Sequence, residues 1–183
     1  MVKFYQHSFK YDYPWSNVTY AFWVRYPNPF ASHVHSVDVL DRTVDPVTGV
    51  LRTTRIILKS GKLPKWAPRG IVKNTEAFII EESEVDPHTR TMVTRTRNLS
   101  HARVMSVEET QTFRPHPDNR EWTEVTTEAR VVSRLGFGLT GRIEGFGVKR
   151  YSDNTAKSRM GMLHVLQMLR DKQLLGFMKP QQS

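Results

Sequence analysis

Residues 33–133 are dominated by valine, threonine, isoleucine and aromatic residues, and clusters of turn-forming residues divide this stretch into short segments. The turn clusters lie at residues 45–49, 86–89 and 115–119. Runs of β-forming residues joined by short turns are typical of antiparallel strands that pair with their sequence neighbours. The predicted strands are residues 34–44, 50–59, 75–85, 91–99, 103–113 and 122–133.

A further strand and a short helix are predicted ahead of this region. Residues 2–11 are rich in β-formers, and Pro14 suits the first turn of a helix, with Asp12 as a candidate N-cap. The apolar residues Trp15, Val18 and Phe22 recur at helical spacing. Arg25 lies three residues further along the same face, and Pro27 ends the pattern.

After Gly138 the β pattern stops, and one helical pattern runs to about Leu175. Its predicted apolar face consists of Ile143, Phe146, Met160, Leu163, Leu166 and Leu169. A sheet of this length must cover one face, and only this helix is large enough to do so. The sequence therefore predicts an α+β helix-grip domain, in which a curved antiparallel sheet wraps a long C-terminal helix and leaves a cavity. We expect one domain over residues 1–177, followed by a short flexible tail over 178–183.

Several classes of site are excluded by what the sequence lacks. The chain has no cysteine, so it can hold no disulfide, thiolate metal site or cysteine nucleophile. Motifs of phosphate-binding loops, zinc proteases and serine hydrolases are absent. No run approaches the roughly 18 apolar residues of a membrane span, and the first residues do not form a secretory signal, so we expect a soluble protein. His33 and His35 could begin a metal site, but a solvated strand face is the simpler interpretation, and no catalytic or metal-binding residue is predicted.

The charge balance points to an anionic partner. Lysine and arginine total 27 against 18 acidic residues, which gives a net charge of +9. The surplus is concentrated in residues 46–75, which hold seven basic residues and no acidic one, and in the C-terminal helix. The adjacent acids Glu81-Glu82 and Glu108-Glu109 point to opposite faces of their strands, and surface charge is their simplest role.

Some of these cations are predicted to face the interior. Arg25 ends an apolar stripe, Lys59 shares the alternation of Ile57, and Arg150 and Lys157 continue the stripe of the long helix toward the sheet. A buried cation needs an anion, and a phosphate group would supply one. The alternative is that these side chains extend to solvent at the ends of their elements.

The long connection around residues 60–72 combines the apolar Leu63 and Trp66 with Lys62 and Lys65. A tryptophan beside lysines suits a membrane interface with anionic lipid head groups. The alternative is that Trp66 is buried in the core. Binding of nucleic acid is a competing interpretation of the basic charge, although the aromatic residues do not interleave with lysine and arginine as single-strand binding requires.

Five stretches together resemble the PRELI/Ups family of phospholipid transfer proteins of the mitochondrial intermembrane space. They are Arg-Tyr-Pro-Asn-Pro at 25–29, Ser-Gly-Lys-Leu-Pro-x-Trp at 60–66, Asn-Leu-x-His at 98–101, Val-Glu-Glu at 107–109 and Lys-Ser-Arg-Met-Gly-Met at 157–162. The resemblance implies a seven-stranded helix-grip fold of the START/phosphatidylinositol-transfer type, whose internal cavity takes one phospholipid beneath a lid at about residues 62–71. It also assigns roles to eight residues: lipid-phosphate contacts at Arg25, Lys59, Lys62, Arg150 and Lys157, and lid and membrane contacts at Leu63, Lys65 and Trp66.

The same resemblance implies a function and a partner. We expect a non-enzymatic carrier of phosphatidic acid between the outer and inner mitochondrial membranes that supplies cardiolipin synthesis, with the phospholipid as cargo and no cofactor. The Tyr13-Pro14-Trp15 stretch is similar to the phosphatidylserine branch of the family, which keeps that cargo as an alternative. The implied partner is a small helical-hairpin protein with twin Cys-x9-Cys motifs, and the implied location is the intermembrane space, peripheral on the inner membrane. A nucleic-acid-binding module is the alternative from another class.

Overall fold

The computed structural model describes residues 2–60, 76–102, 105–133 and 140–177, and in the last range the side chains of residues 145, 149 and 151–172. Its elements follow the predicted order: a strand, a short helix, six strands and a long helix. The elements are β1 (Val2–Tyr11), α1 (Trp15–Trp23), the 3-10 turn η1 (Pro29–Ala31), β2 (Val34–Val44), β3 (Leu51–Ser60), β4 (Glu76–Asp86), β5 (Thr91–Asn98), β6 (Met105–Pro115), β7 (Thr123–Ser133) and α2 (Thr140–Phe177).

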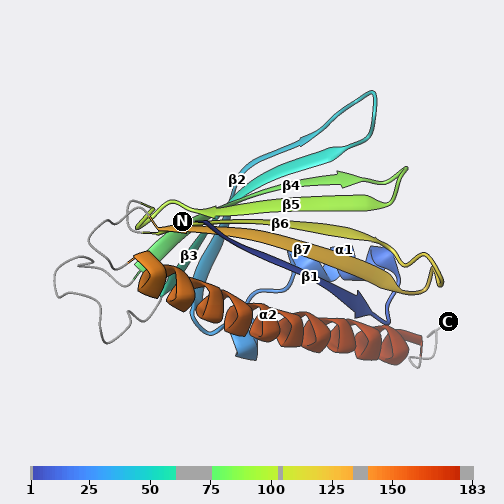
Figure 1. Cartoon of the computed structure of the whole chain (residues 1–183). Helices are drawn as coiled ribbons and strands as arrows, with labels where there is room; N and C mark the ends of the chain where they lie inside the picture. Colours follow the sequence, from blue (N-terminus) through green and yellow to red (C-terminus); the bar gives the residue numbers. More distant parts are fainter. Residues whose placement is uncertain (1, 61–75, 103–104, 134–139, 178–183) are drawn as a thin grey trace.

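The strands form one seven-stranded antiparallel sheet in the order β1-β7-β6-β5-β4-β3-β2. Figure 1 shows α2 running along one face of the sheet and α1 near one end of the sheet. The predicted α+β helix-grip architecture is therefore confirmed, with element ends shifted by one or two residues. Within the described residues, no helix is both long and apolar enough to span a bilayer.

Two hairpin turns are set by aspartates. Asp45 accepts hydrogen bonds from the backbone N–H groups of Val47 and Thr48 at 2.9 and 3.0 Å. Asp86 accepts equivalent bonds from His88 and Thr89 at 2.8 and 3.2 Å. These local bonds favour turns over continued strands, which explains why the turn clusters were correctly predicted.

Strand register divides the helix-facing side of the sheet into chemically distinct rows. One row is apolar and consists of Leu51, Val85, Met92, Phe113, Val125 and Phe9. The next row is polar and consists of Thr53, Ser83, Thr94, Gln111, Thr127 and His7. The third row carries the charges and consists of Arg55, Glu81, Thr96, Glu109, Ala129 and Tyr5. The core therefore lies at the apolar end, where Met162, Val165 and Leu166 of α2 pack on Phe113 and Val125.

The helix α2 presents to the sheet a face that only partly matches the predicted one: Leu166 is buried and Leu169 packs against the core, as predicted. Among the described side chains of α2, the buried ones are Tyr151, Thr155, Met162, Val165 and Leu166. Met160 and Leu163, which were assigned to the apolar face, are exposed. The prediction failed for these residues because the buried stripe of α2 includes the polar Thr155. The more continuous run of apolar residues therefore indicated a wrong rotation of the helix about its axis.

The start of α1 also differs from the prediction. Pro14 itself occupies the N-cap position, without a side-chain cap, and its carbonyl accepts hydrogen bonds from the Asn17 and Val18 N–H groups. Asp12 forms an ion pair with Lys10 at 2.9 Å instead of capping the helix.

Candidate functional site

The centre of the candidate site is a buried cluster of two arginines and one glutamate. Arg25 lies just beyond the end of α1, and its Nη2 donates to Oε2 of Glu81 at 2.7 Å. Arg55 lies opposite Glu81 across the β3–β4 pair, and its Nε and Nη2 both donate to Oε1, the former at 2.8 Å. The exposed fractions of Arg25, Arg55 and Glu81 are 9%, 3% and 1%. Two buried guanidinium groups therefore share one carboxylate, and the cluster keeps an excess of positive charge.

Aromatic rings from α1 cover these cations. The guanidinium of Arg25 lies 4.0 Å from the ring centre of Phe22, and that of Arg55 lies 4.8 Å from the ring centre of Trp23. Such contacts stabilise a cation that has lost its water. The Nε of Arg25 is buried and has no hydrogen-bond partner among the described residues. A buried donor of this kind costs free energy unless a ligand or water accepts its hydrogen bond.

The pKa values of the two arginines are shifted in opposite directions, although burial acts to lower both. Burial lowers the pKa of Arg55, and the Glu81 carboxylate only partly offsets this effect. Burial is the largest single influence on the pKa of Arg25 and acts to lower it, but the combined electrostatic effect of Tyr26, Glu81 and Glu109 outweighs burial, so the pKa is raised. Both groups stay protonated near neutral pH, because the pKa of a guanidinium starts above 12.

A second carboxyl group, on Glu109, lies in the same charged row of the sheet. Burial raises the pKa of Glu109, although the Tyr151 hydroxyl, Arg25 and Lys59 act to lower it. Burial and the neighbouring Glu109 together raise the pKa of Tyr151. The Tyr151 hydroxyl approaches this carboxyl, but it completes no hydrogen bond among the described residues. The charged row thus continues from the arginine cluster toward α2.

The five residues that were predicted to contact the lipid phosphate differ in their exposure and in whether the structure describes them. Arg25 is buried on the helix-facing side of the sheet, and Lys59 is half-buried at the end of the inward-facing series Thr53, Arg55 and Ile57 on β3. Lys157 is exposed, so the prediction that it points into the interior is wrong, for the same reason as the rotation of α2. Arg150 lies on α2, but its side chain is outside the described part of the structure, as are Lys62 and the lid residues Leu63, Lys65 and Trp66.

Sequence analysis missed Arg55, Glu81 and Glu109 as site residues. Glu81 and Glu109 were interpreted as surface charge, and this interpretation is wrong for Glu81, which is almost fully buried, and for Glu109, which is half-buried. Alternation does separate Glu81 from the exposed Glu82, and it places Arg55 beside Lys59 on one face of β3. The missing signal was the register of β3 against β4, which pairs Arg55 with Glu81.

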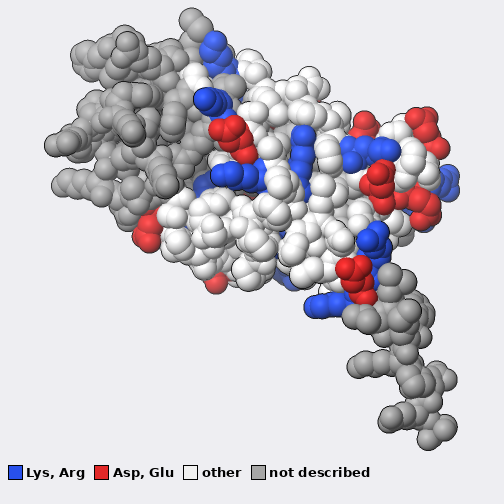
Figure 2. Space-filling view, turned by 90° about the horizontal axis from the view of Figure 1, so that it is seen from below, with Lys and Arg blue, Asp and Glu red and all other residues white. Residues whose placement is uncertain are grey.

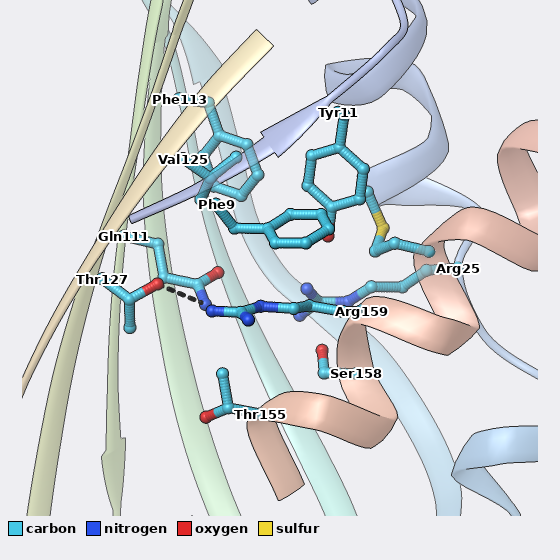
Figure 3. Close-up of a pocket in the computed structure, with 11 residues that line it drawn as sticks. Phe9, Tyr11, Arg25, Gln111, Phe113, Val125, Thr127, Thr155, Ser158 and Arg159 are labelled. Carbon is cyan, nitrogen blue, oxygen red and sulfur yellow. Dashed lines mark hydrogen bonds between the residues drawn. The ribbon is translucent and has the colours of Figure 1, made fainter. Parts of the chain in front are cut away.

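A pocket opens next to this cluster, between the sheet and α2. Its walls come from β1, β6 and β7, from α2, and from Arg25 (Figure 3). Its space is about 20 Å³, enough for a group of about the size of a water molecule. A pocket therefore lies between the sheet and the helix beside the buried cations, but its space is far smaller than a phospholipid, so the expected lipid cavity stays a prediction.

A match to the PRELI-like family covers residues 16–172. The chain belongs to the PRELI-like family. It is 43% identical to the mitochondrial PRELI domain-containing protein 1 of Gallus gallus over 155 residues, which cover 84% of this chain and 71% of the relative. It is 41% identical to the mitochondrial protein UPS1 of Saccharomyces cerevisiae over 167 residues, which cover 90% and 92% of the two chains. These relatives confirm the PRELI/Ups resemblance and the mitochondrial localisation that it implied.

Solved structures with low sequence identity share the fold of this PRELI-like protein. The Zhui aromatase/cyclase from a Streptomyces species matches with a TM-score of 0.60 and 12% identity, over 91% of this chain and 94% of that one. A protein from Thermus thermophilus matches with a TM-score of 0.58 and 16% identity, over 91% and 99% of the two chains. At this identity the likeness concerns the fold alone.

Two of the stretches that carry the PRELI/Ups resemblance meet in space. Asn28 accepts a hydrogen bond from Phe30 N–H at 2.9 Å through its Oδ1 and donates through Nδ2 to the Arg25 carbonyl at 2.6 Å. Gly161 of α2 lies directly against this amide. The 25–29 stretch and the 157–162 stretch thus hold the backbone of Arg25 against the long helix.

Proposed function

We propose that this PRELI-like protein is a non-enzymatic carrier that moves phosphatidic acid between the outer and inner mitochondrial membranes and so supplies cardiolipin synthesis. The observation that carries the proposal is the buried guanidinium of Arg25, which shares the Glu81 carboxylate with Arg55 and keeps an Nε without a partner among the described residues. A cation in these surroundings favours an anionic ligand that brings its own apolar part with it.

The energetic argument for a carrier concerns the acyl chains. A phospholipid leaves a bilayer only if its chains stay away from water, and each buried methylene contributes about 0.8 kcal/mol. A helix-grip fold can shield chains between its sheet and its long helix, and the cationic cluster would then select the head group. Such a cycle needs no nucleophile, no cofactor and no covalent step, so the phospholipid is cargo.

Phosphatidylserine is the alternative cargo, supported by the Tyr13-Pro14-Trp15 stretch. Nucleic-acid binding is favoured by no observation besides the net charge. On the face seen in Figure 2, basic side chains are spread out and most acidic ones gather near one end beside further basic ones, so the described part of this face carries no continuous basic stripe. The resemblance also supports a heterodimer with a small twin Cys-x9-Cys protein and peripheral binding to the inner membrane through Leu63, Lys65 and Trp66.

Native mass spectrometry of the purified protein tests the class and the head group together. A co-purified phosphatidic acid supports the proposal, and a co-purified phosphatidylserine supports the alternative cargo. Transfer of fluorescent phosphatidic acid between liposomes then tests the site. Arg25→Ala should abolish transfer while keeping the fold, because Glu81 retains its bonds to Arg55.

The matched control is Arg95→Ala, which removes the same charge from an exposed position on β5. Arg25→Lys should give intermediate transfer, since a point charge replaces a fork that can bind phosphate through two parallel hydrogen bonds. Transfer by Arg25→Ala at the wild-type rate would remove Arg25 from the site.

A further inference from the structure

The pocket beside Arg25 has a composition that suits a phosphate group. Besides the Tyr11 hydroxyl, its polar lining consists of Arg25, Arg159, Gln111, Thr127, Thr155 and Ser158. None of the described residues that line it is acidic. Figure 3 shows the side chains of Arg25 and Arg159 both extending into the pocket, with Arg159 reaching toward Gln111 and Thr127. Two guanidinium groups thus converge on one space whose walls offer donors and hydroxyl groups.

Arg159 has few partners of its own. Its Nη1 lies 3.3 Å from the ring Nε2 of His7, and its guanidinium lies 4.5 Å from the ring centre of Phe9. Within the described residues, no carboxylate forms an ion pair with it. Both contacts position the side chain along β1 without neutralising it, because neither partner is an anion. Arg25 shares Glu81 with Arg55, and the half-buried Glu109 is a further carboxyl that acts on Arg25 electrostatically.

The remaining polar side chains of the pocket differ in the hydrogen bonds that they already make. The Gln111 amide donates to the Thr127 hydroxyl across a long 3.4 Å contact. The Thr155 hydroxyl also lines the pocket, but it donates its one hydrogen to the Tyr151 carbonyl at 2.9 Å and so is not counted among the donors. The Gln111 amide and the Thr127 hydroxyl can therefore reorient toward an anion at little cost, as a phosphate site requires.

The apolar row closes the far side of the pocket. Phe113, Val125 and Met162 line it there and are almost fully buried in the core. A phosphodiester carries a head group beyond its phosphate, and that group would have to displace these side chains. A phosphomonoester ends at the phosphate and exposes three oxygens, which suits two guanidinium groups better than a diester does.

We propose that Arg159 is a second phosphate ligand facing Arg25, and that the pocket between them receives the phosphate of a phosphomonoester lipid end-on. The proposal rests on the function proposed above and assigns a specificity role to a residue outside the five phosphate contacts that the resemblance implied. Arg159 binds the second charge of the monoester, whereas the closed apolar end excludes larger head groups.

The test compares Arg159→Gln with Arg170→Gln, which removes the same charge from an exposed position of the same helix. Binding of dioctanoyl phosphatidic acid and dioctanoyl phosphatidylserine is measured by titration calorimetry, and transfer of each lipid is measured between liposomes. Arg159→Gln should weaken phosphatidic acid binding by roughly tenfold or more, since a hydrogen bond to a charged group is lost. The preference for phosphatidic acid over phosphatidylserine should fall with it. Arg159→Lys should restore part of both, and Arg170→Gln should change neither.

The outcomes separate the two proposals. If the wild type binds phosphatidic acid but Arg159→Gln keeps its affinity and preference, Arg159 is not a ligand, whereas the proposed function stands. If the wild type binds no phosphatidic acid, the proposed function fails and takes this assignment with it. Inorganic phosphate serves as a competitor: displacement of the lipid by inorganic phosphate at equal concentration would identify a free-phosphate site and overturn the lipid assignment. Arg159→Lys keeps the charge and length, so it tests the assignment even if Arg159→Gln does not fold.

Discussion

Gly161 of α2 lies against Asn28 so closely that a Cβ on the glycine would be 2.9 Å from both the nitrogen and the oxygen of the Asn28 amide group. Asn28 in turn holds the Arg25 carbonyl and the N-terminus of η1. The long helix therefore approaches the arginine cluster only because residue 161 has no side chain. The position of Arg25 therefore depends, through Asn28, on a glycine of the long helix.

Gly161→Ala should lower the free energy of unfolding, although alanine in place of glycine ordinarily stabilises a helix interior by about 1 kcal/mol. The added methyl group must displace an amide that already makes two hydrogen bonds, and a forced shift in a packed contact costs about 1–3 kcal/mol. Gly145→Ala is the control, because a Cβ there meets nothing within 4 Å. Thermal unfolding should thus move in opposite directions for the two variants, and a stabilised Gly161→Ala would show that the contact yields easily.

Glu81→Gln should destabilise the protein strongly, by about 3–5 kcal/mol, because two buried guanidinium groups would lose their shared carboxylate. Glu82→Gln changes the neighbouring, exposed residue and should stay within about 0.5 kcal/mol of the wild type. Urea unfolding measures both. Equal and small losses would mean that the arginines find other anions or water.

The burial of Glu81 beside the exposed Glu82 also shows which features could be predicted from the sequence and which could not. Alternation and turn residues were sufficient for the seven strands, because hairpins in an antiparallel sheet depend on local patterns. The partner of Arg25 could not be found in this way, because Glu81 is 56 residues distant and meets it only through the fold. Arg25 itself was found, because a cation at the end of an apolar stripe is unusual.

The prediction of the buried face of α2 failed in part for a related reason. A helical stripe can be identified from apolar periodicity only if the buried face is apolar throughout, whereas α2 buries Tyr151 and Thr155 over the polar and charged rows of the sheet. The polar residues that line the pocket interrupt the apolar periodicity from which a buried helix face is predicted. Lys157 was misplaced and Arg159 was overlooked through this single error of rotation.

The raised pKa of Glu109 gives a prediction about pH. A carboxyl whose pKa is higher in the folded state than in the unfolded one favours folding at low pH. This contribution is complete below the unfolded pKa, near 4.5, and is lost as the pH rises through the higher folded value. Glu109→Gln removes the titrating group. The difference in unfolding free energy between the variant and the wild type should therefore favour the variant increasingly from about pH 4.5 upward, as measured by urea unfolding at a series of pH values.

The control for this series is Glu108→Gln, which alters the neighbouring, exposed carboxyl on β6 and so separates the effect of Glu109 from that of removing any carboxyl at this point of the strand. A pH-independent difference for Glu109→Gln would show that Glu109 titrates in the folded protein as it does in the unfolded chain.

The last prediction concerns Trp66 and the lysines beside it, for which the proposed function gives a role at the membrane. Trp66→Ala should weaken binding to anionic liposomes even at low salt, because an indole ring anchors at head-group depth through contacts that salt does not screen. Lys62→Ala and Lys65→Ala should weaken binding in a way that high salt imitates, since each cation contributes about 1 kcal/mol near an anionic surface. The Debye length falls from roughly 10 Å at 0.1 M salt to about 3 Å at 1 M, so the wild type at high salt should resemble the lysine variants.

Liposome flotation and fluorescent-lipid transfer, each across a salt series and a range of anionic lipid content, measure the two effects. Very acidic membranes should slow net transfer by delaying release. A Trp66→Ala variant that matches the wild type in both assays would identify Trp66 as a core residue and exclude the proposed lid.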